Sequence, residues 1–327
     1  MAEYIGIKGS TIQTIAGDPP APIEGQVWYN STSTVLKGSG KFISSGAWAS
    51  GGNMNTGRTA LASFGTQTAG MAAAGYQTPT PKDEAETYNG TAWTEVANVT
   101  SARRLAHGAG TTTAGIIFGG LATPTATVLG KTETWNGSSW TEVADLTNAR
   151  KNPASAQQGT TTAALAFSGD NVGVKDFTES WNGTSWTEVG DLNTAREHAA
   201  GSGTQPAALC FGGGPGGTPY IASTETWNGS SWTEVGDLNT ARPYLSAAGS
   251  NTAALAIGGG AYPPIIANTE SWNGTSWTEV AALGTATADG GGCGTQTAGL
   301  AFGGAPGNQV VTQEWTVGQT TKTFTAT

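Results

Sequence analysis

Arginine recurs at one place in a repeated stretch of this sequence, at positions 45 to 47 residues apart. The row consists of Arg58, Arg103, Arg150, Arg196 and Arg242, and Thr287 takes the place of Arg in the last copy. A row of guanidinium groups on one face could bind acidic ligands, because the planar guanidinium fork matches a carboxylate. The alternative is that each Arg forms an ion pair inside its own repeat.

Acidic residues lie at matching positions in the copies and could serve as partners for the Arg row. They are Glu133, Glu179 and Glu225 in one series and Asp145, Asp191 and Asp237 in another. A catalytic site needs different side chains that converge on one point, whereas this row repeats one side chain in one local setting. We therefore favour a structural ion pair and predict no catalytic residue in the row.

The remaining groups that could do chemistry are few. His107 and His198 lack a surrounding cluster of carboxylates, so they make a weak metal site. Cys210 and Cys293 occupy small-residue positions typical of packing thiols. The stretch "SGDNVGVKD" at 168–176 hints at a calcium loop but lacks its full pattern. We predict no metal site and no cofactor.

Asn-Gly followed by Ser or Thr occurs in five copies, beginning at Asn89, Asn136, Asn182, Asn228 and Asn273. This tripeptide is an acceptor for N-glycosylation, but Asn-Gly between two strands also marks a tight hairpin turn. The N-terminus shows no basic segment followed by an apolar core, so we expect no signal peptide and a chain made in a cytoplasm. We therefore favour the turn.

Short strands must position these residues. "TETW" and "WTEV" flank the Asn-Gly turn, and Thr, Val and Trp suit a half-buried pleated surface. The second Trp of the pair recurs at Trp93, Trp140, Trp186, Trp232 and Trp277, with Trp48 as an additional copy. "TAALAF" predicts a further strand with large residues on one face and small ones on the other, which suits stacked identical sheets. A fourth strand fits the small residues after each Arg, as in "REHAAGSG".

Four strands in every 45 or so residues, repeated six times, predict the blades of a β-propeller. The pattern of Arg, "FGG", "TETWNG", Trp and "DLNTAR" resembles the kelch motif. That resemblance implies an all-β, six-bladed kelch-like β-propeller over residues 46–327, with four-stranded antiparallel blades. We expect residues 46–50 to complete the last blade by pairing with 312–317, and the tail 318–327 is a competing candidate for that strand.

Residues 1–45 differ from the repeats. "PIEGQVWYNSTSTVLKGSGKFI" resembles a short β module of bacteriophage tail-fibre and other virion proteins, in which it precedes a display domain. The resemblance implies attachment to a virus particle through other virion proteins. The alternative is an ordinary hairpin packed on the propeller.

The copies differ most after each Gly-Gly, where the segments vary in length and content. Exposed aromatic, apolar and amide side chains there would form one surface that contacts a partner. The hypothetical binding residues are Tyr76, Asn171, Tyr220, Ile221, Tyr262, Ile265 and Asn308. The alternative is that these loops vary because nothing constrains them.

Composition restricts the function further. The net charge is −9 and no basic cluster is present, which argues against nucleic-acid binding, and no apolar run is long enough to insert in a membrane. We predict a non-enzymatic structural or display protein of a bacteriophage virion, whose loops contact a host-surface glycan or protein or neighbouring subunits. The alternatives are a sialidase-like carbohydrate-active enzyme, with acidic side chains at the central channel, and a head or tail decoration protein without a ligand.

Overall fold

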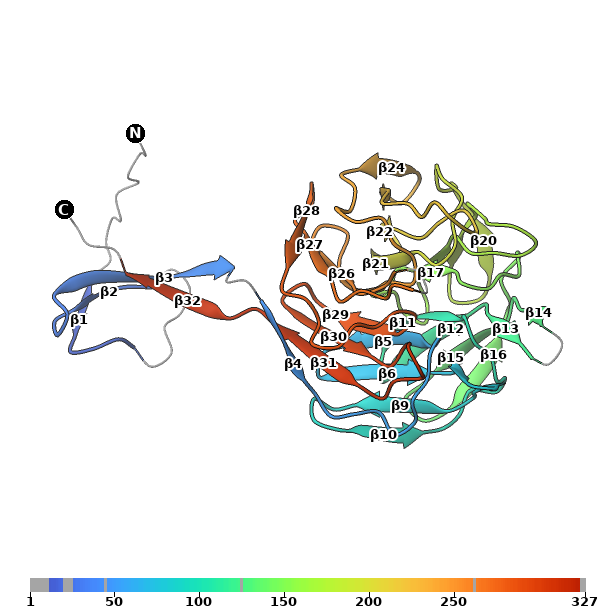
Figure 1. Ribbon diagram of the computed structural model, residues 1–327, viewed down its shortest axis with the longest axis horizontal. Helices are drawn as coiled ribbons and strands as arrows, with labels where there is room; N and C mark the ends of the chain where they lie inside the picture. Colours follow the sequence, from blue (N-terminus) through green and yellow to red (C-terminus); the bar gives the residue numbers. More distant parts are fainter. Residues whose placement is uncertain (1–11, 20–25, 44–45, 124–125, 261–262, 324–327) are drawn as a thin grey trace. The chain divides into compact units, whose positions relative to one another are not determined.

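The computed structural model of the chain describes residues 12–19, 26–43, 46–123, 126–260 and 263–323. Within these ranges the secondary structure is all β, without a helix. The chain divides into two compact units (Figure 1). The small unit comprises Met1–Gly46 and Val317–Thr327, and the large unit comprises Ala47–Thr316.

The large unit consists of four-stranded antiparallel sheets that follow one another along the chain, and we name each sheet by its first strand. The β5 sheet contains β5 (Ala62–Thr66), β6 (Ala69–Ala73), β9 (Ala85–Tyr88) and β10 (Trp93–Val96). The β11 sheet contains β11 (His107–Thr111), β12 (Ala114–Phe118), β15 (Thr132–Trp135) and β16 (Trp140–Val143). The β17 sheet contains β17 (Ala154–Ser155), β18 (Ala164–Phe167), β19 (Thr178–Trp181) and β20 (Trp186–Glu188).

The second half of the large unit continues in the same way. The β21 sheet contains β21 (Ala200–Thr204), β22 (Ala207–Phe211), β23 (Thr224–Trp227) and β24 (Trp232–Val235). The β25 sheet contains β25 (Ser246–Gly249), β26 (Ala254–Ile257), β27 (Thr269–Trp272) and β28 (Trp277–Val280). The β29 sheet contains β29 (Gly291–Gly294), β30 (Ala298–Phe302), β31 (Thr312–Thr316) and β4 (Ala47–Ser50).

Two short hairpins follow the second strands of the first two sheets. They are β7 (Tyr76–Gln77) with β8 (Thr80–Pro81), and β13 (Leu121–Ala122) with β14 (Thr127–Val128). Four-stranded antiparallel sheets repeated along one chain are consistent with the blades of a β-propeller. The predicted all-β class and the four-stranded antiparallel sheets are therefore confirmed.

The predicted Asn-Gly turn joins the third and fourth strands in five of the described sheets, and it is a four-residue loop. Trp135 pairs with Trp140 in register, so the loop spans the whole of 136–139. Gly137 has a φ of 94°, and the side chain of Asn136 accepts hydrogen bonds from the backbone N–H groups of Ser138 and Ser139. Asn therefore closes the loop through its side-chain oxygen, not through a left-handed backbone of its own. The same bonds occur at Asn89, Asn182, Asn228 and Asn273.

Neighbouring sheets stack by fitting large residues onto small ones, as the alternation in "TAALAF" predicts. A methyl group added at Gly70 would lie 2.9 Å from Leu300 of the β29 sheet. One added at Gly299 would lie 3.2 Å from Leu255 of the β25 sheet. Phe167 of the β17 sheet likewise packs in one buried cluster with Cys210 of the β21 sheet. Each fully buried large side chain stabilises the stack by about 1.5–3 kcal/mol.

The outer strand of the β29 sheet comes from the beginning of the large unit. β4 pairs antiparallel with β31, with Ala47 opposite Thr316 and Trp48 opposite Trp315. The competing tail segment forms β32 (Gln319–Thr323), which pairs with β3 (Val35–Ile43) of the small unit. Residues from 317 onward therefore group with the small unit, whereas the sequence-based boundary placed them in the propeller. The physical reason is this pairing of β32 with β3.

The small unit is a mixed sheet. β1 (Gln13–Ile15) lies parallel to β2 (Val27–Asn30), and β2 lies antiparallel to β3. Asp18 accepts hydrogen bonds from Trp28 at 3.3 Å, Asn30 at 2.8 Å and Lys37 at 2.8 Å. The hydrogen bond from Lys37 is the main cause that holds the pKa of Asp18 below its ordinary value. The Trp, Asn and Lys of "WYNSTSTVLK" thus have structural roles around one carboxylate.

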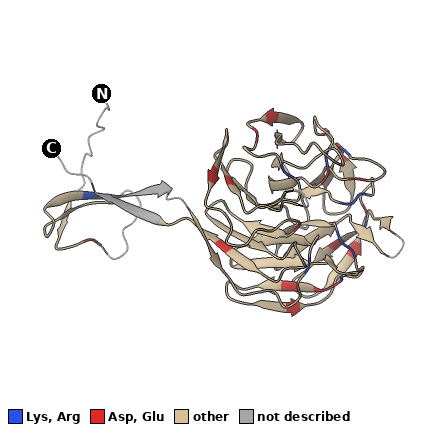
Figure 2. Cartoon of the chain, viewed as in Figure 1, with Lys and Arg blue, Asp and Glu red and all other residues tan. Residues whose placement is uncertain are grey.

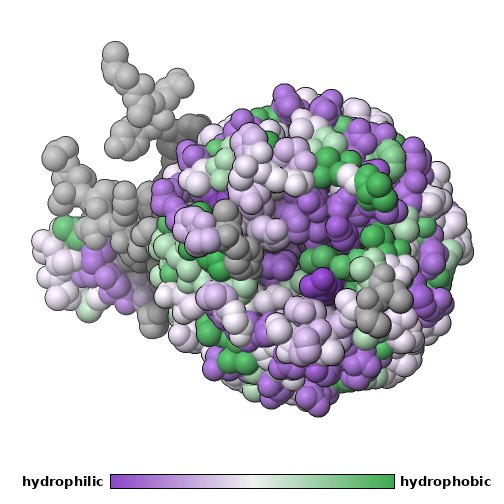
Figure 3. Space-filling view, turned by 45° about the vertical axis from the view of Figure 1, so that its right-hand side comes forward, coloured by the Kyte–Doolittle hydropathy of each residue, from purple (hydrophilic) through white to green (hydrophobic). Residues whose placement is uncertain are grey.

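The innermost strands of neighbouring sheets lie side by side, with β5 next to both β11 and β29. The outer strands instead carry exposed acidic side chains, which Figure 2 shows in red. They are Glu95, Glu142, Glu188, Glu234 and Glu279. Charge on an open strand edge discourages pairing with another chain. Figure 3 shows hydrophobic residues in small separate groups on one face, and the large hydrophobic side chains exposed among the described residues are Ile12 and Val172.

Candidate functional site

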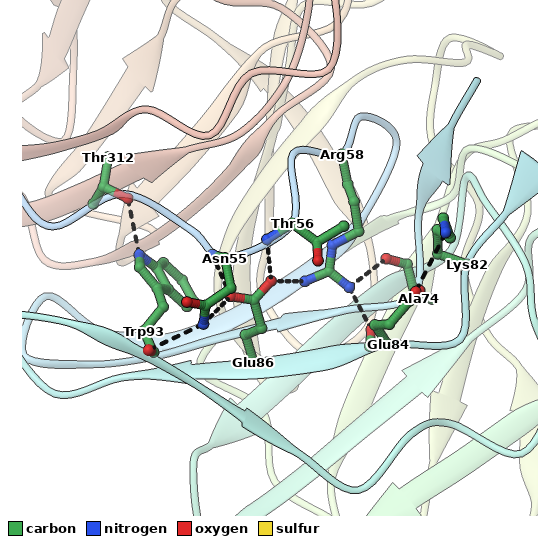
Figure 4. A network of polar contacts seen from close by, with 9 residues as sticks. All are labelled: Asn55, Thr56, Arg58, Ala74, Lys82, Glu84, Glu86, Trp93 and Thr312. Carbon is green, nitrogen blue, oxygen red and sulfur yellow. Dashed lines mark hydrogen bonds and ion pairs between the residues drawn. The ribbon is translucent and has the colours of Figure 1, made fainter. Parts of the chain in front are cut away.

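Each Arg of the repeated row reaches a glutamate on the third strand of its sheet. Arg58 Nη2 lies 2.8 Å from Glu86 Oε1, and neither side chain is exposed (Figure 4). Arg58 Nη1 also donates to the backbone oxygens of Ala74 at 3.3 Å and Glu84 at 2.5 Å. The other oxygen of Glu86 accepts a hydrogen bond from the backbone N–H of Asn55 at 2.8 Å. The pair therefore connects the segment before β5 to the end of β6 and to β9.

The other sheets repeat this arrangement. Their pairs are Arg103–Glu133 and Arg196–Glu225, both at 2.5 Å, together with Arg150–Glu179 and Arg242–Glu270. The alternative partners Asp145, Asp191 and Asp237 instead accept the backbone N–H of the first residue of the third strand. The carboxylate on the third strand is thus the partner of the Arg side chain.

The β29 sheet replaces both members of the pair together. Thr287 takes the place of Arg and donates to Gly303 O at 2.9 Å. Gln313 takes the place of Glu and makes two hydrogen bonds with the backbone of Thr285, at 3.0 and 3.1 Å. A joint loss of both charges leaves no buried charge without a partner. All five Arg side chains are at most 1% exposed, so the row does not present guanidinium groups to a ligand.

A second set of six residues lies two positions after each Arg and after Thr287. It consists of Ala60, Leu105, Asn152, His198, Tyr244 and Asp289, and we call it the left-handed set because every member has a φ between 51° and 60°. This backbone conformation costs a residue other than Gly about 1–2 kcal/mol. The left-handed set repeats one backbone conformation with six different side chains. The Arg row, in contrast, repeats one side chain.

Backbone hydrogen bonds link the left-handed set from sheet to sheet. The N–H of Ala60 donates to Asp289 O at 2.7 Å, and that of Leu105 donates to Ala60 O at 2.8 Å. Asn152 donates in the same way to Leu105, Asp289 to Tyr244, and Tyr244 to His198, at 2.9 to 3.0 Å. These bonds bring six different side chains around one small cavity of about 30 Å³, which has room for a water molecule.

Polar and aromatic side chains of the set contact one another at this cavity. The ring of His198 lies against that of Tyr244, with ring centroids 4.0 Å apart and the ring planes inclined at 45°. Asn152 Nδ2 lies 3.2 Å from His198 Nε2 and donates to Glu197 Oε2 at 3.1 Å. Burial lowers the pKa of His198 to about 3, so its imidazole is neutral at physiological pH. A neutral imidazole offers one donor and one acceptor to its surroundings.

Asp289 is the acidic member of the set. Burial raises the pKa of its carboxyl group to about 6, and the positive charge of Arg104 opposes this shift. Within the described residues its side chain makes no hydrogen bond. Arg104 itself lies over the Tyr76 ring, 4.5 Å from its centroid. His107 also lines the cavity, and burial lowers its pKa to about 4.

A wider groove shares His198 and Tyr244 with the cavity. Its volume is about 230 Å³, and it is also lined by Glu197, Pro243, Tyr220 and the glycines 214, 216 and 217. Glu197 Oε1 lies 3.8 Å from the position that a methyl group at Gly216 would occupy. Burial raises the pKa of the Glu197 carboxyl, and burial likewise raises the pKa of Tyr244 to about 12. The groove therefore combines two Tyr side chains with one carboxylate on a wall of glycines.

The structure describes six of the seven loop residues that the sequence predicted as binding residues. Tyr76, Asn171, Tyr220, Ile221, Ile265 and Asn308 are all half-buried, whereas the prediction made them exposed, and Tyr262 lies outside the described residues. Asn171 donates to the backbone oxygen of Ala149 at 2.9 Å, which is a local structural contact. With its amide oriented to suit its neighbours, Asn308 bonds the backbone of Tyr76 and Thr78 in the β7–β8 hairpin. Of these residues, Tyr220 lines the groove.

The other candidates from the sequence have packing or local roles. Cys210 and Cys293 are buried free thiols, and burial raises the pKa of each to about 12. Asp170 of "SGDNVGVKD" pairs with Lys151 and accepts the backbone N–H of Gly173. Across the part of the chain that the structure describes, no three His, Cys, Asp or Glu side chains gather as metal ligands.

The left-handed set was not identified from the sequence. A signal was present, because these positions follow the Arg row in phase and differ in every copy. Within the described ranges no helix is long and apolar enough to cross a membrane. The sequence matches no protein-family model and no curated protein. The geometry of the site therefore has to support the functional interpretation by itself.

Proposed function

We propose that the large unit is a closed, six-bladed kelch-like β-propeller and that the protein is a non-enzymatic display protein of a bacteriophage virion. The small unit would attach it to the particle through other virion proteins. The face that carries the left-handed set and the variable loops would contact a host surface or a neighbouring subunit.

Contacts between the first and last sheets support closure. Trp93 of the β5 sheet packs on Phe302 of the β29 sheet with ring centroids 4.7 Å apart, and its Nε1 donates to Thr312 Oγ1 at 2.9 Å. Equivalent Trp-to-Thr bonds join Trp186 to Thr132 and Trp232 to Thr178 in consecutive sheets. A ring in which the last interface repeats the others leaves each sheet with a neighbour on both sides.

The observation that carries the display role is a small sheet built from segments that lie on both sides of the large unit in the sequence. The described segments β1, β2 and β3 precede the large unit in sequence, and β32 follows it, yet the four strands form one sheet. The large unit is thus held by two covalent connections to a single small module. This architecture suits a head presented by an attachment module, and it agrees with the resemblance of residues 1–45 to virion modules.

The test is mass spectrometry and cryo-electron microscopy of particles from the system that produces this chain. We expect the protein in purified particles, with density for the small unit against another virion protein and with the variable loops facing outward. Loops buried against neighbouring subunits would instead support an architectural role. Absence of the protein from particles would contradict the virion assignment.

A glycoside hydrolase is a second candidate, because Glu197 and Asp289 both have raised pKa values and line adjoining spaces. A sialidase-like reaction is disfavoured, since its anionic substrate needs free guanidinium groups and the repeated Arg residues are paired and buried. Incubation of the full chain with fluorogenic glycosides decides between the two. Release of the fluorophore that is lost in Glu197→Gln would replace the non-enzymatic proposal.

A further inference from the structure

The groove lined by Tyr220 and Tyr244 contains the carboxylate of Glu197. One oxygen of this carboxylate is fixed by its neighbours, and the other faces the groove wall. Glu197 Oε2 is fixed by Asn152 Nδ2 at 3.1 Å and by contact with His198 Nε2 at 3.3 Å. Within the described part of the chain, Oε1 of the same carboxylate has no hydrogen bond, and it points toward Gly216 on the groove wall. A carboxylate oxygen oriented in this way accepts hydrogen bonds from a donor-rich ligand.

The other walls of the groove offer apolar faces and space. Tyr220 is half-buried and supplies an aromatic ring, while Pro243 and Tyr244, whose ring already lies against His198, complete the lining. Aromatic rings pack well against flat C–H faces. At Gly217 an added methyl group would meet no atom within 4 Å, so this part of the wall opens into free space. The volume of about 230 Å³ is below the roughly 300–1,000 Å³ typical of drug-sized ligands and suits a ligand of one ring.

Charge near the groove disfavours an anionic ligand. The lining contains Glu197 and no Lys or Arg. Lys151, the cation whose charge acts on Glu197, already pairs with Asp170, and Arg196 next to Glu197 pairs with Glu225. A phosphate or a sugar acid would therefore meet a carboxylate without a compensating cation, which costs binding free energy.

We propose that this groove binds a neutral pyranose sugar, whose hydroxyl groups donate to Glu197 Oε1 and whose C–H face packs on the ring of Tyr220. Asn152 and His198 are positioning residues, because both contact the other oxygen of the Glu197 carboxylate. The proposal rests on the display role for its biological meaning and names the ligand class that such a face would recognise.

Binding should depend on the ionisation of Glu197. The charged and titratable groups that face Glu197 are Asp170, Lys151, His198 and Tyr244. A hydroxyl group donates a stronger hydrogen bond to a carboxylate than to a carboxylic acid. Since the pKa of Glu197 is raised, affinity should fall as the pH is lowered from 7.5 to below 5, and a sugar should lower that pKa when bound.

The experiment measures binding of four neutral methyl pyranosides to the purified full-length chain by saturation-transfer NMR and calorimetry. The probes are the methyl glycosides of glucose, galactose, mannose and N-acetylglucosamine, compared with galacturonate, inorganic phosphate and choline. We expect saturable binding of at least one neutral sugar with a Kd on the order of 1 mM. Tyr220→Ala should weaken it about fivefold or more, because packing on an aromatic ring contributes roughly 1 kcal/mol, which corresponds to that factor in Kd.

Gly217→Phe is a second variant, designed to fill the groove without disturbing the fold. Its backbone φ lies outside the left-handed region, and its added side chain points into free space, so the melting temperature should stay unchanged while binding is lost. Ile265→Ala is the control, since this half-buried loop residue lies outside the groove lining and should leave the Kd unchanged.

Failure to bind any neutral sugar at concentrations of roughly tens of millimolar would overturn the proposal. Tighter binding of choline, galacturonate or phosphate would overturn it as well, and so would sugar binding that survives in Gly217→Phe. These results concern the purified chain, so they are independent of whether the protein is found in particles.

Discussion

The Arg of each Arg–Glu pair lies two residues before a member of the left-handed set, yet the pairs and the set follow opposite rules. The pair is the same in five sheets, is fully buried, and is replaced as a unit by Thr287 and Gln313 in the other sheet. The left-handed set has one backbone conformation but six different side chains, which line a cavity. Repetition of a side chain thus marks what each sheet needs to fold. Under the display role that we propose, the varied side chains on a repeated backbone are the ones that would serve recognition.

Breaking one Arg–Glu pair should have the largest effect on stability. Arg196→Thr leaves Glu225 buried without its cation, so we expect a loss of about 3–5 kcal/mol in the free energy of unfolding. The double variant Arg196→Thr with Glu225→Gln reproduces the Thr287–Gln313 arrangement and should cost clearly less than the single variant. Guanidinium denaturation followed by tryptophan fluorescence measures both.

An exposed ion pair provides the matched control. Lys131 and Glu142 lie 2.7 Å apart with side chains 32% and 47% exposed. Lys131→Thr should change stability by less than about 1 kcal/mol, because water screens the pair. If the double variant in the buried pair lost as much stability as the sum of its two single variants, the pair would not act as a unit and the comparison would fail.

Neutralising Asp289 should stabilise the protein at neutral pH. Its carboxyl group keeps its proton up to a pH of about 6 in the folded chain, against an ordinary value of 3.8. Between these values the unfolded state binds fewer protons, so the free energy of unfolding falls as the pH rises from 4 to 6, and the deficit persists above 6. Asp289→Asn removes this deficit. We expect a gain of about 1–3 kcal/mol at pH 7.5 that disappears near pH 4.

The pH dependence separates this effect from simple packing. Denaturation of Asp289→Asn and of the unaltered chain at pH 4.0, 6.0 and 7.5 gives the difference at each value. A constant gain at all three would show that ionisation is not its cause. A gain that depends on pH would show that Asp289 reduces the stability of the fold at neutral pH, as residues of functional sites often do, and it would therefore support the proposed recognition role.

The sequence predicted the repeated half of this comparison well. The motif "TAALAF" and the Trp series predict the all-β class, the four-stranded sheets and the stacking of large residues on small ones. They do so because a strand that is buried on both faces tolerates few alternative arrangements of large and small side chains. Glu133, Glu179 and Glu225 were among the candidate partners of the Arg row, but the sequence could not choose between them and Asp145, Asp191 and Asp237. The choice between Glu and Asp depends on which of the two carboxylates points toward the buried guanidinium group, and the fold sets that direction.

The candidate site was not predicted for a physical reason. His198, Tyr244 and Asp289 lie in different repeats, and they meet because backbone hydrogen bonds between sheets join the same position of each copy. The loops that looked variable were expected to be exposed, but residues such as Asn308 bond the neighbouring loop and are half-buried. Glu197 could not be singled out either, because its fixed oxygen depends on Asn152 from the preceding sheet.

The smallest expected effect tests whether the left-handed backbone is strained. Ala60 has a φ of 52° and an exposed fraction of 7%, whereas Ala62, two residues later in β5, is fully buried outside the left-handed region. Ala60→Gly removes the steric penalty of the left-handed conformation but increases the freedom of the unfolded chain. We expect it to be neutral or stabilising by up to about 1 kcal/mol, and Ala62→Gly to destabilise by about 1 kcal/mol.

Thermal and guanidinium unfolding of the two variants measures this difference directly. Equal destabilisation by Ala60→Gly and Ala62→Gly would mean that the left-handed conformation carries no strain. Tyr244 and His198 would then adopt it without an energetic cost. A difference of the expected sign means that Gly would suit every position of the set better than the residue found there. The six side chains would then be retained against a local backbone preference, as expected if they serve recognition.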